Sequence, residues 1–127
     1  MELVALVTGL AVLQTFYFAF MVGKARMTAK IDAPAMIGDE GLERAVRVHA
    51  NTVEQLVIFL PGLWMFGYYV DPRYAAGIGM LFVIGRFIYR SAYVGDPKKR
   101  SAGFAIGALA KLVLVVGGMI GAAMNLM

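Results

Sequence analysis

The sequence contains no cysteine, one histidine and few charged residues. The absence of cysteine excludes disulfide bonds, thiolate metal sites and a cysteine nucleophile. One histidine is too few for a zinc cluster, so we expect no bound metal. Charged residues make up 16% of the 127 residues and apolar residues 61%, whereas a soluble domain is about a quarter charged and about half apolar. A small water-exposed domain cannot bury this much apolar surface, so the composition indicates a membrane-embedded protein.

Long uncharged stretches predict membrane-spanning helices. Residues 3–23 carry no charge, and the segment 101–127 carries only Lys111. About 20 apolar residues suffice for a helix to cross a bilayer. The first stretch is longer than the apolar part of a typical signal peptide, so we expect it to remain as a helix. We predict one all-α domain over residues 1–127, an antiparallel bundle of four transmembrane helices at residues 3–23, 42–70, 73–94 and 101–126.

Lysine and arginine are concentrated in two of the three connections. Residues 24–30 hold three of them and residues 98–100 hold three more. The connection between the second and third helices has only Arg73, and neither terminus has any. The positive-inside rule therefore predicts that both basic connections face the cytoplasm and that both termini lie on the opposite side. In a bacterial cell the membrane would be the inner membrane.

The second and third helices each carry a polar stripe. Four polar residues of the second helix fall within roughly 80° of arc, and four of the third within roughly 100°. These residues are Arg44, Arg47, Asn51 and Glu54 on the second helix, and Arg86, Tyr89, Arg90 and Tyr93 on the third. Ionisable side chains within a membrane segment are costly, usually face the bundle interior, and indicate a functional site.

Glu54 is the one carboxylate in these stripes, and we expect it to be paired. Glu54, Arg86 and Lys111 lie at a similar depth, roughly 15–18 Å from the same end of the bundle. An isolated carboxylate there is heavily penalised, so we predict a buried ion pair or triad of Glu54 with Arg86 or Lys111. Lys111 could equally extend its ammonium toward the headgroups. Because arginines outnumber this carboxylate, we predict a net positive cavity that takes an anionic guest.

The stripes resemble conserved signatures of the MAPEG family, the membrane-associated proteins in eicosanoid and glutathione metabolism. The segment 42–54 resembles the family's helix-two signature, and the segment 86–100 resembles its second block. The matching positions read Leu42-Glu43-Arg44-x-x-Arg47-x-x-x-Asn51-x-x-Glu54 and Arg86-x-x-Tyr89-x-x-x-Tyr93, with Arg100 seven residues on. This spacing is most similar to the leukotriene C synthase branch. The likeness covers essentially the whole chain.

The resemblance implies a homotrimer, with glutathione bound between neighbouring subunits near the cytoplasmic side. Residues at matching positions would hold glutathione: Arg47, Asn51, Glu54, Tyr89, Tyr93 and Arg100. Arg100 would lie nearest the sulfur as the catalytic residue, and Arg26 would be a second, catalytic helper. Further candidates for binding glutathione are Arg44 and Arg86, which share the stripes, and Ser101, because the Arg100-Ser101 pair resembles the prostaglandin E synthase branch.

Two positions depart from the family branches. Gln55 stands where the leukotriene branch has a tyrosine, and Tyr89 replaces the histidine of the prostaglandin branch. Neither eicosanoid specificity can therefore be transferred to this chain.

We expect from this resemblance a glutathione-dependent integral membrane transferase or peroxidase of the microsomal glutathione transferase type. Glutathione is the expected co-substrate, and a lipophilic electrophile or lipid hydroperoxide is its reaction partner. We expect membrane lipid but no nucleic acid as a partner. The alternative is a non-catalytic membrane protein of the same fold that binds an anionic lipid or another anionic ligand in its basic pocket. A channel is disfavoured because residues 56–66 are too apolar for a polar path.

Overall fold

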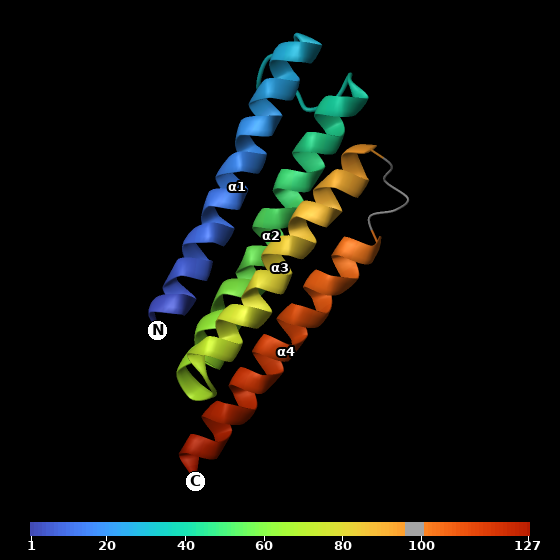
Figure 1. The fold of residues 1–127 in the computed structure, drawn as a ribbon. Coiled ribbons are helices and arrows are strands. Elements are labelled where there is room, and N and C mark those ends of the chain that lie inside the picture. Colours follow the sequence, from blue (N-terminus) through green and yellow to red (C-terminus); the bar gives the residue numbers. More distant parts are fainter. Residues whose placement is uncertain (96–100) are drawn as a thin grey trace.

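The computed structural model describes residues 1–95 and 101–127, which form four long helices. These are α1 (Glu2–Ala29), α2 (Glu40–Tyr69), α3 (Pro72–Gly95) and α4 (Ser101–Leu126). Each helix runs antiparallel to the one before it, and both chain termini lie at the same end of the bundle (Figure 1). The α1–α2 connection lies at the opposite end. The predicted all-α, antiparallel four-helix architecture is confirmed.

Helix α1 is longer than the sequence predicted. It continues past the expected end at Gly23 to Ala29 and stops at Lys30, which adopts the left-handed conformation with φ 58° and ψ 42°. Residues 24–29 are mostly strong helix formers, so nothing in them ends the helix. Arg26 therefore lies in the last turn of α1 and not in a loop after it. At 1.5 Å per residue, α1 is about 42 Å long and exceeds the roughly 30 Å hydrocarbon core of a bilayer.

Asp39 and Asp71 begin α2 and α3. Asp39 precedes α2, and its carboxylate accepts a hydrogen bond from the backbone N–H of Leu42 at 2.9 Å. Asp71 precedes α3 and accepts hydrogen bonds from the backbone N–H groups of Arg73 at 2.7 Å and Tyr74 at 3.3 Å. Carboxylates at these positions satisfy backbone donors that have no partner inside the helix, and they suit the positive end of the helix dipole.

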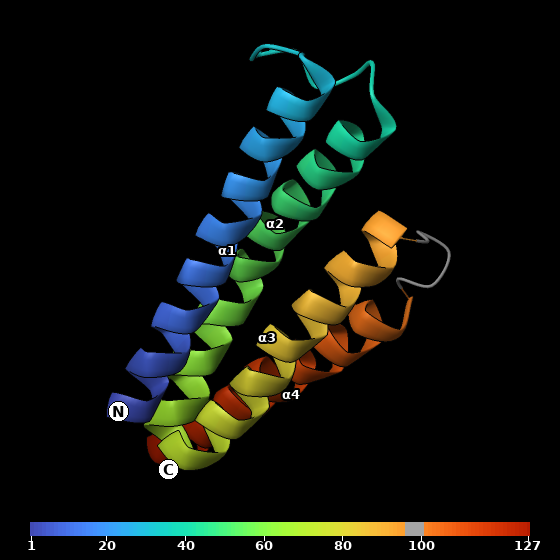
Figure 2. The ribbon, with the colours of Figure 1, turned by 45° about the horizontal axis from the view of Figure 1, so that its top comes forward.

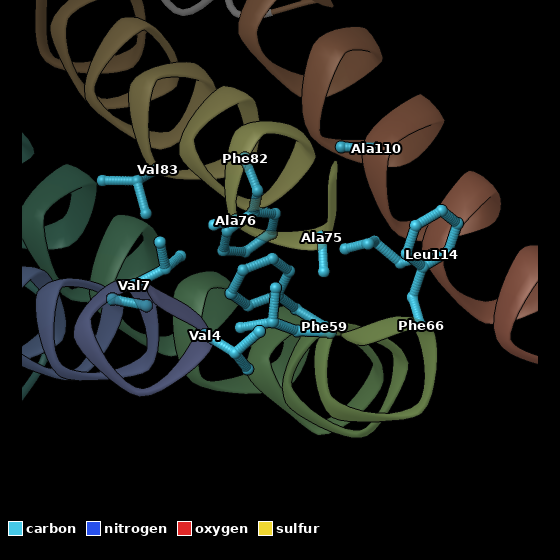
Figure 3. Packing of buried hydrophobic residues seen from close by; sticks show 12 residues of the cluster. Val4, Val7, Phe59, Phe66, Ala75, Ala76, Phe82, Val83, Ala110 and Leu114 are labelled. Carbon is cyan, nitrogen blue, oxygen red and sulfur yellow. The ribbon is translucent and has the colours of Figure 1, made fainter. Parts of the chain in front are cut away.

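The apolar core lies where α1, α2, α3 and α4 all meet, toward the end that holds the termini. Phe59 of α2 and Phe82 of α3 stack at its centre, with ring centroids 3.9 Å apart and planes 10° from parallel. Val4 and Val7 of α1 approach these rings from one side, and Leu114 of α4 lies on the other (Figure 3). This core fixes the rotation of α2 and α3 and thereby decides which of their polar residues face inward.

Helices α3 and α4 approach closely at Gly103. A Cβ atom built on Gly103 would lie 2.5 Å from the backbone nitrogen of Tyr89 and 2.7 Å from the carbonyl oxygen of Gly85. Real Cβ atoms do not tolerate such distances from backbone, so only glycine allows this contact. The contact brings the start of α4 directly against Tyr89, one of the residues predicted to form the site.

The helices differ in how well they suit a membrane. Helices α1 and α4 and residues 72–92 of α3 are long and apolar enough to cross one, whereas α2 does not meet that criterion. Helix α2 carries arginines and glutamates along the part near the α1–α2 connection. Figure 2 shows that α2 nevertheless runs the full length of the bundle beside α1, with α3 and α4 on its other side.

Candidate functional site

An open cavity of about 520 Å³ lies beside the polar stripe of α2. Three of its lining residues are the α2 residues Arg47, Asn51 and Glu54, and a fourth is Tyr89 of α3. The remaining lining residues are Met36, Ile37, Glu43, Val46 and Ala50. Four of the residues that the sequence assigned to a glutathione site are thus brought together on one surface.

The stripe on α2 is a consequence of helical spacing. Residues 47, 51 and 54 recur at intervals of four and three, so they lie on one face, and the buried residues Val48 and Thr52 lie away from it. Arg47 and Glu54 are exposed, whereas Asn51 is half-buried. The Asn51 side-chain oxygen is buried and has no hydrogen-bond partner among the described residues. A buried acceptor without a partner is costly, and an N–H group of a ligand would satisfy it.

Arg86 is directed into the bundle and does not reach the cavity. Its side chain is 2% exposed and donates a hydrogen bond to Thr52 Oγ1 at 2.8 Å. Its guanidinium carbon lies 4.2 Å from the centroid of the Tyr89 ring, a cation–π contact. Arg86 therefore supports the inner side of Tyr89, whose ring also borders the cavity.

The predicted ion pair of Glu54 with Arg86 or Lys111 is wrong. Among the described residues no salt bridge joins Glu54 to either cation. Glu54 is exposed, while Lys111 is only 7% exposed and faces the bundle. Arg86 meets α2 at Thr52, which lies at the expected depth. Thr52 and Glu54 are two residues apart, however, and so lie about 160° from each other around the helix.

The predicted net positive charge of the cavity is also wrong for the described part of one chain. Its charged lining consists of Arg47 together with the carboxylates of Glu43 and Glu54. Two other arginines are not part of this lining: Arg86 is buried in the bundle, and Arg44 forms a salt bridge with Glu40 one turn earlier on α2. A ligand with two negative charges would therefore need positively charged side chains other than those of the described lining.

Arg26 is not among the residues that line the cavity. It donates a hydrogen bond to the carbonyl oxygen of Ala35 in the α1–α2 connection, and it borders a separate surface hollow with Lys30 and Asp32. Arg44, on α2, is not among the residues that line the cavity either. In one chain, these two candidates are thus not brought together with Arg47, Asn51 and Glu54.

Three predicted residues lie at the α3–α4 connection. The backbone of Tyr93 belongs to α3, but its side chain lies outside the described part of the structure. Arg100 lies outside the described residues altogether. Ser101 is exposed and is the first residue of α4. Within residues 1–95 and 101–127, no group of three His, Asp or Glu side chains is arranged to hold a metal ion.

Sequence reasoning missed several residues that shape this region. Met36 and Ile37 of the α1–α2 connection line the cavity, although the segment was interpreted only as a loop. Thr52 accepts the hydrogen bond of Arg86, yet a threonine inside a helix gives no signal of such a role. Gln14, which is 4% exposed, donates to the carbonyl oxygen of Val83 at 2.8 Å and joins α1 to α3. It stands out in the sequence as the one amide in the apolar stretch 3–23.

Comparison with known proteins identifies the family of the chain. The MAPEG family model matches residues 4–120. An uncharacterized protein of Synechocystis is 43% identical over 91% of this chain and 85% of its own length. Human microsomal glutathione S-transferase 2 is 40% identical over 89% of this chain and 78% of its own length. Bovine leukotriene C4 synthase is 32% identical over 89% of this chain and 75% of its own length. The chain is therefore an integral membrane protein that belongs to the MAPEG family.

Proposed function

We propose that this protein is a glutathione-dependent membrane transferase or peroxidase. The observation that carries the proposal is the gathering of Arg47, Asn51, Glu54 and Tyr89 around one cavity. It is supported by the similarity to human microsomal glutathione S-transferase 2 and bovine leukotriene C4 synthase. The reaction joins the glutathione thiolate to a lipophilic electrophile, or reduces a lipid hydroperoxide at the expense of two glutathione molecules, which become the disulfide.

The described lining suits part of glutathione. Glu54 and the unpartnered side-chain oxygen of Asn51 are acceptors for its ammonium group. Arg47 offers a planar pair of N–H donors for one carboxylate. The phenol of Tyr89 can hydrogen-bond the peptide. The second carboxylate and the thiolate still require positive charge, because the described lining contains two carboxylates and one cation.

We assign this remaining charge to Arg100 and to a neighbouring copy of the chain. Arg100 directly precedes α4 in the sequence, and α4 begins at Ser101, two residues before the glycine that contacts Tyr89. A guanidinium near the sulfur favours the thiolate over the thiol and stabilises the charge of the attacking form. The cavity is open on its outer side, so a second copy can close it and contribute Arg26. We therefore propose the homotrimer that the family resemblance implies.

The test is glutathione binding and turnover by the detergent-solubilised protein. Glutathione should raise the melting temperature, and the protein should conjugate it to a model electrophile such as chlorodinitrobenzene or reduce cumene hydroperoxide. Arg100→Ala should abolish turnover while leaving the melting temperature unchanged, because it removes the charge beside the sulfur. Arg73→Ala is the matched control, since Arg73 lies at the other end of α3. Absence of a glutathione-dependent shift, together with no conjugation or reduction, would overturn the proposal.

A second variant tests the ammonium contact. Glu54→Gln should weaken glutathione binding by about tenfold or more, because hydrogen bonds to a charged group contribute about 1.5–3 kcal/mol. Glu40→Gln is its control, since Glu40 pairs with Arg44 and does not line the cavity. Equal affinities of the two variants, measured by calorimetric titration, would place the ammonium group elsewhere.

A non-catalytic role in binding an anionic lipid at this cavity is less well supported. The two carboxylates of Glu43 and Glu54 would repel a phosphate headgroup that meets only Arg47 among the described lining residues. Mass spectrometry of the purified protein separates the two hypotheses. A co-purified anionic lipid that glutathione does not displace would favour the non-catalytic role.

A further inference from the structure

A second cavity lies between α1 and α2, on roughly the opposite side of α2 from the candidate functional site. Its volume is about 230 Å³. Ala45 and Val48 of α2 line it, and helical spacing turns them about 150° and about 90° away from the centre of the polar stripe. Phe18 and Met21 of α1 supply much of the apolar wall, together with Ala25. Because α2 separates the two cavities, this one is not part of the proposed glutathione site.

Two cations border this apolar cavity, Lys24 from α1 and Arg90 from α3. Among the described residues no salt bridge is formed by either. Arg90 is half-buried, and its guanidinium carbon lies 5.5 Å from the centroid of the Tyr17 ring. The cavity also contacts Asp39, whose carboxylate is engaged with the backbone N–H of Leu42 at the start of α2. The described lining therefore combines an apolar wall with a net positive charge.

The cavity opens to the surface of the chain, since two of its lining residues, Lys24 and Thr28, are exposed. Phe20 and Tyr17 are large, exposed side chains on the same stretch of α1, and α1 is apolar enough to span a membrane. Exposed aromatic side chains on such a helix face the lipid phase. A molecule can thus enter the cavity from the bilayer with its chain against Phe18 and its polar group beside Arg90.

We propose that this cavity binds a single-chain lipid carboxylate, with the chain along Phe18 and Met21 and the carboxylate between Arg90 and Lys24. The planar guanidinium of Arg90 matches a carboxylate in shape and charge. The volume is below the roughly 300–1,000 Å³ of pockets for drug-sized ligands, so it has room for the carboxylate and part of one chain and not for the two chains of a phospholipid. The proposal does not depend on glutathione chemistry, because none of these residues lines the other cavity.

The experiment measures oleate binding to the full chain in phosphatidylcholine nanodiscs. Wild-type protein should bind labelled oleate, and unlabelled oleate should displace it, whereas methyl oleate, which has no charge, should not. The double substitution of Arg90→Gln and Lys24→Gln should weaken oleate binding by about tenfold or more, since it removes both charged donors. Arg73→Gln is the control for removing a single positive charge, at the other end of α3, and it should leave oleate affinity unchanged.

Two further measurements keep the test independent of folding and of the proposed function. Lys24→Gln alone changes an exposed side chain, so it should retain the wild-type melting temperature and still weaken oleate binding in the same direction. Glutathione affinity should be unchanged in every one of these variants. The proposal is overturned if methyl oleate displaces labelled oleate as well as oleate does, or if phosphatidylglycerol does so. It is also overturned if Arg73→Gln weakens oleate binding as much as the double substitution does, or if folded Lys24→Gln binds oleate with unchanged affinity.

Discussion

Arg86 is the largest of the side chains that the structure buries almost completely, and its surroundings have to compensate for its charge. Thr52 accepts one of its hydrogen bonds and the Tyr89 ring covers its guanidinium, while its Nε atom has no partner among the described residues. An ionised group within a membrane bundle is tolerated only when such contacts replace water. The same contacts hold Tyr89 against the candidate site.

Thr52→Val tests this support at the scale of one hydroxyl group. The variant keeps the shape of the side chain but removes the acceptor of Arg86, so we expect a loss of about 1–3 kcal/mol in unfolding free energy and a weaker affinity for glutathione. Thr15→Val is the control, because among the described residues the Thr15 hydroxyl donates to the carbonyl oxygen of Ala11 in its own helix and to no other helix. Thermal unfolding in detergent, without and with glutathione, measures the stability and the glutathione-dependent shift of each variant. Identical melting temperatures for the two variants would show that Arg86 does not need Thr52.

Asp71 gives the bundle a pH-dependent contribution to stability. The backbone N–H of Arg73 donates to its carboxylate and holds the pKa of Asp71 below its ordinary value of 3.8. Because the folded-state pKa is lowered, the stabilisation is fully present above the unfolded value and is lost as the pH falls through the folded value. Asp71→Asn keeps an acceptor but cannot ionise. The melting-temperature difference between wild type and Asp71→Asn should shrink as the pH is lowered below 3.8; a constant difference would contradict this assignment.

At the residue scale, the spacing of polar residues predicted which residues of α2 share a face but not the direction of Arg86. Arg47, Asn51 and Glu54 share a face because all three belong to one helix, where angles follow from sequence separation alone. The prediction for Arg86 was wrong because it required the rotation of α3 relative to α2. That rotation is set by contacts such as the stacking of Phe59 on Phe82, which no spacing within one helix reveals.

At the scale of elements, Gly103 allows α4 to approach α3. Gly103→Ala should lower the unfolding free energy by about 1–3 kcal/mol, because its Cβ would meet the backbone of Tyr89 and force the helices apart. Gly77→Ala, also within a helix, is the matched control. No atom lies within 4 Å of its added Cβ, so alanine there should be neutral or stabilise by up to about 1 kcal/mol. Equal thermal stability of the two variants would argue against a tight α3–α4 contact.

The existence of the four helices was predictable, and so were most of their ends. Asp39, Asp71 and the glycine- and proline-containing connections mark where helices begin and end. The end of α1 was missed because Gly23 was expected to end the helix and the charged residues after it were interpreted as a loop. Charge ends a membrane-embedded stretch without ending a helix, so α1 continues to Ala29 through strong helix formers.

At the scale of the whole molecule, the distribution of charge predicts the orientation in the membrane. The described end with the α1–α2 connection carries Lys24, Arg26 and Lys30, while the two termini lie at the other end. Because the chain has no cysteine, single substitutions report on each end without background. In a bacterial inner membrane, Met127→Cys should react with an impermeant maleimide in intact cells, and Met36→Cys should react only after permeabilisation. The reverse pattern of labelling would invert the proposed topology.

Helix α2 is the least apolar of the four helices, and this has a consequence for biogenesis. Glu54 lies near the middle of α2, whereas Arg44 and Arg47 lie near its start, and a charge at the centre of a helix costs about 2.5–3.5 kcal/mol on insertion scales, so this segment is unfavourable for the translocon to release into lipid by itself. Helix α3 follows after only Val70 and Asp71, and it is apolar. The two therefore have to enter the bilayer as one hairpin, so that a longer linker between them would lower the yield of inserted protein without changing a single contact in the finished bundle.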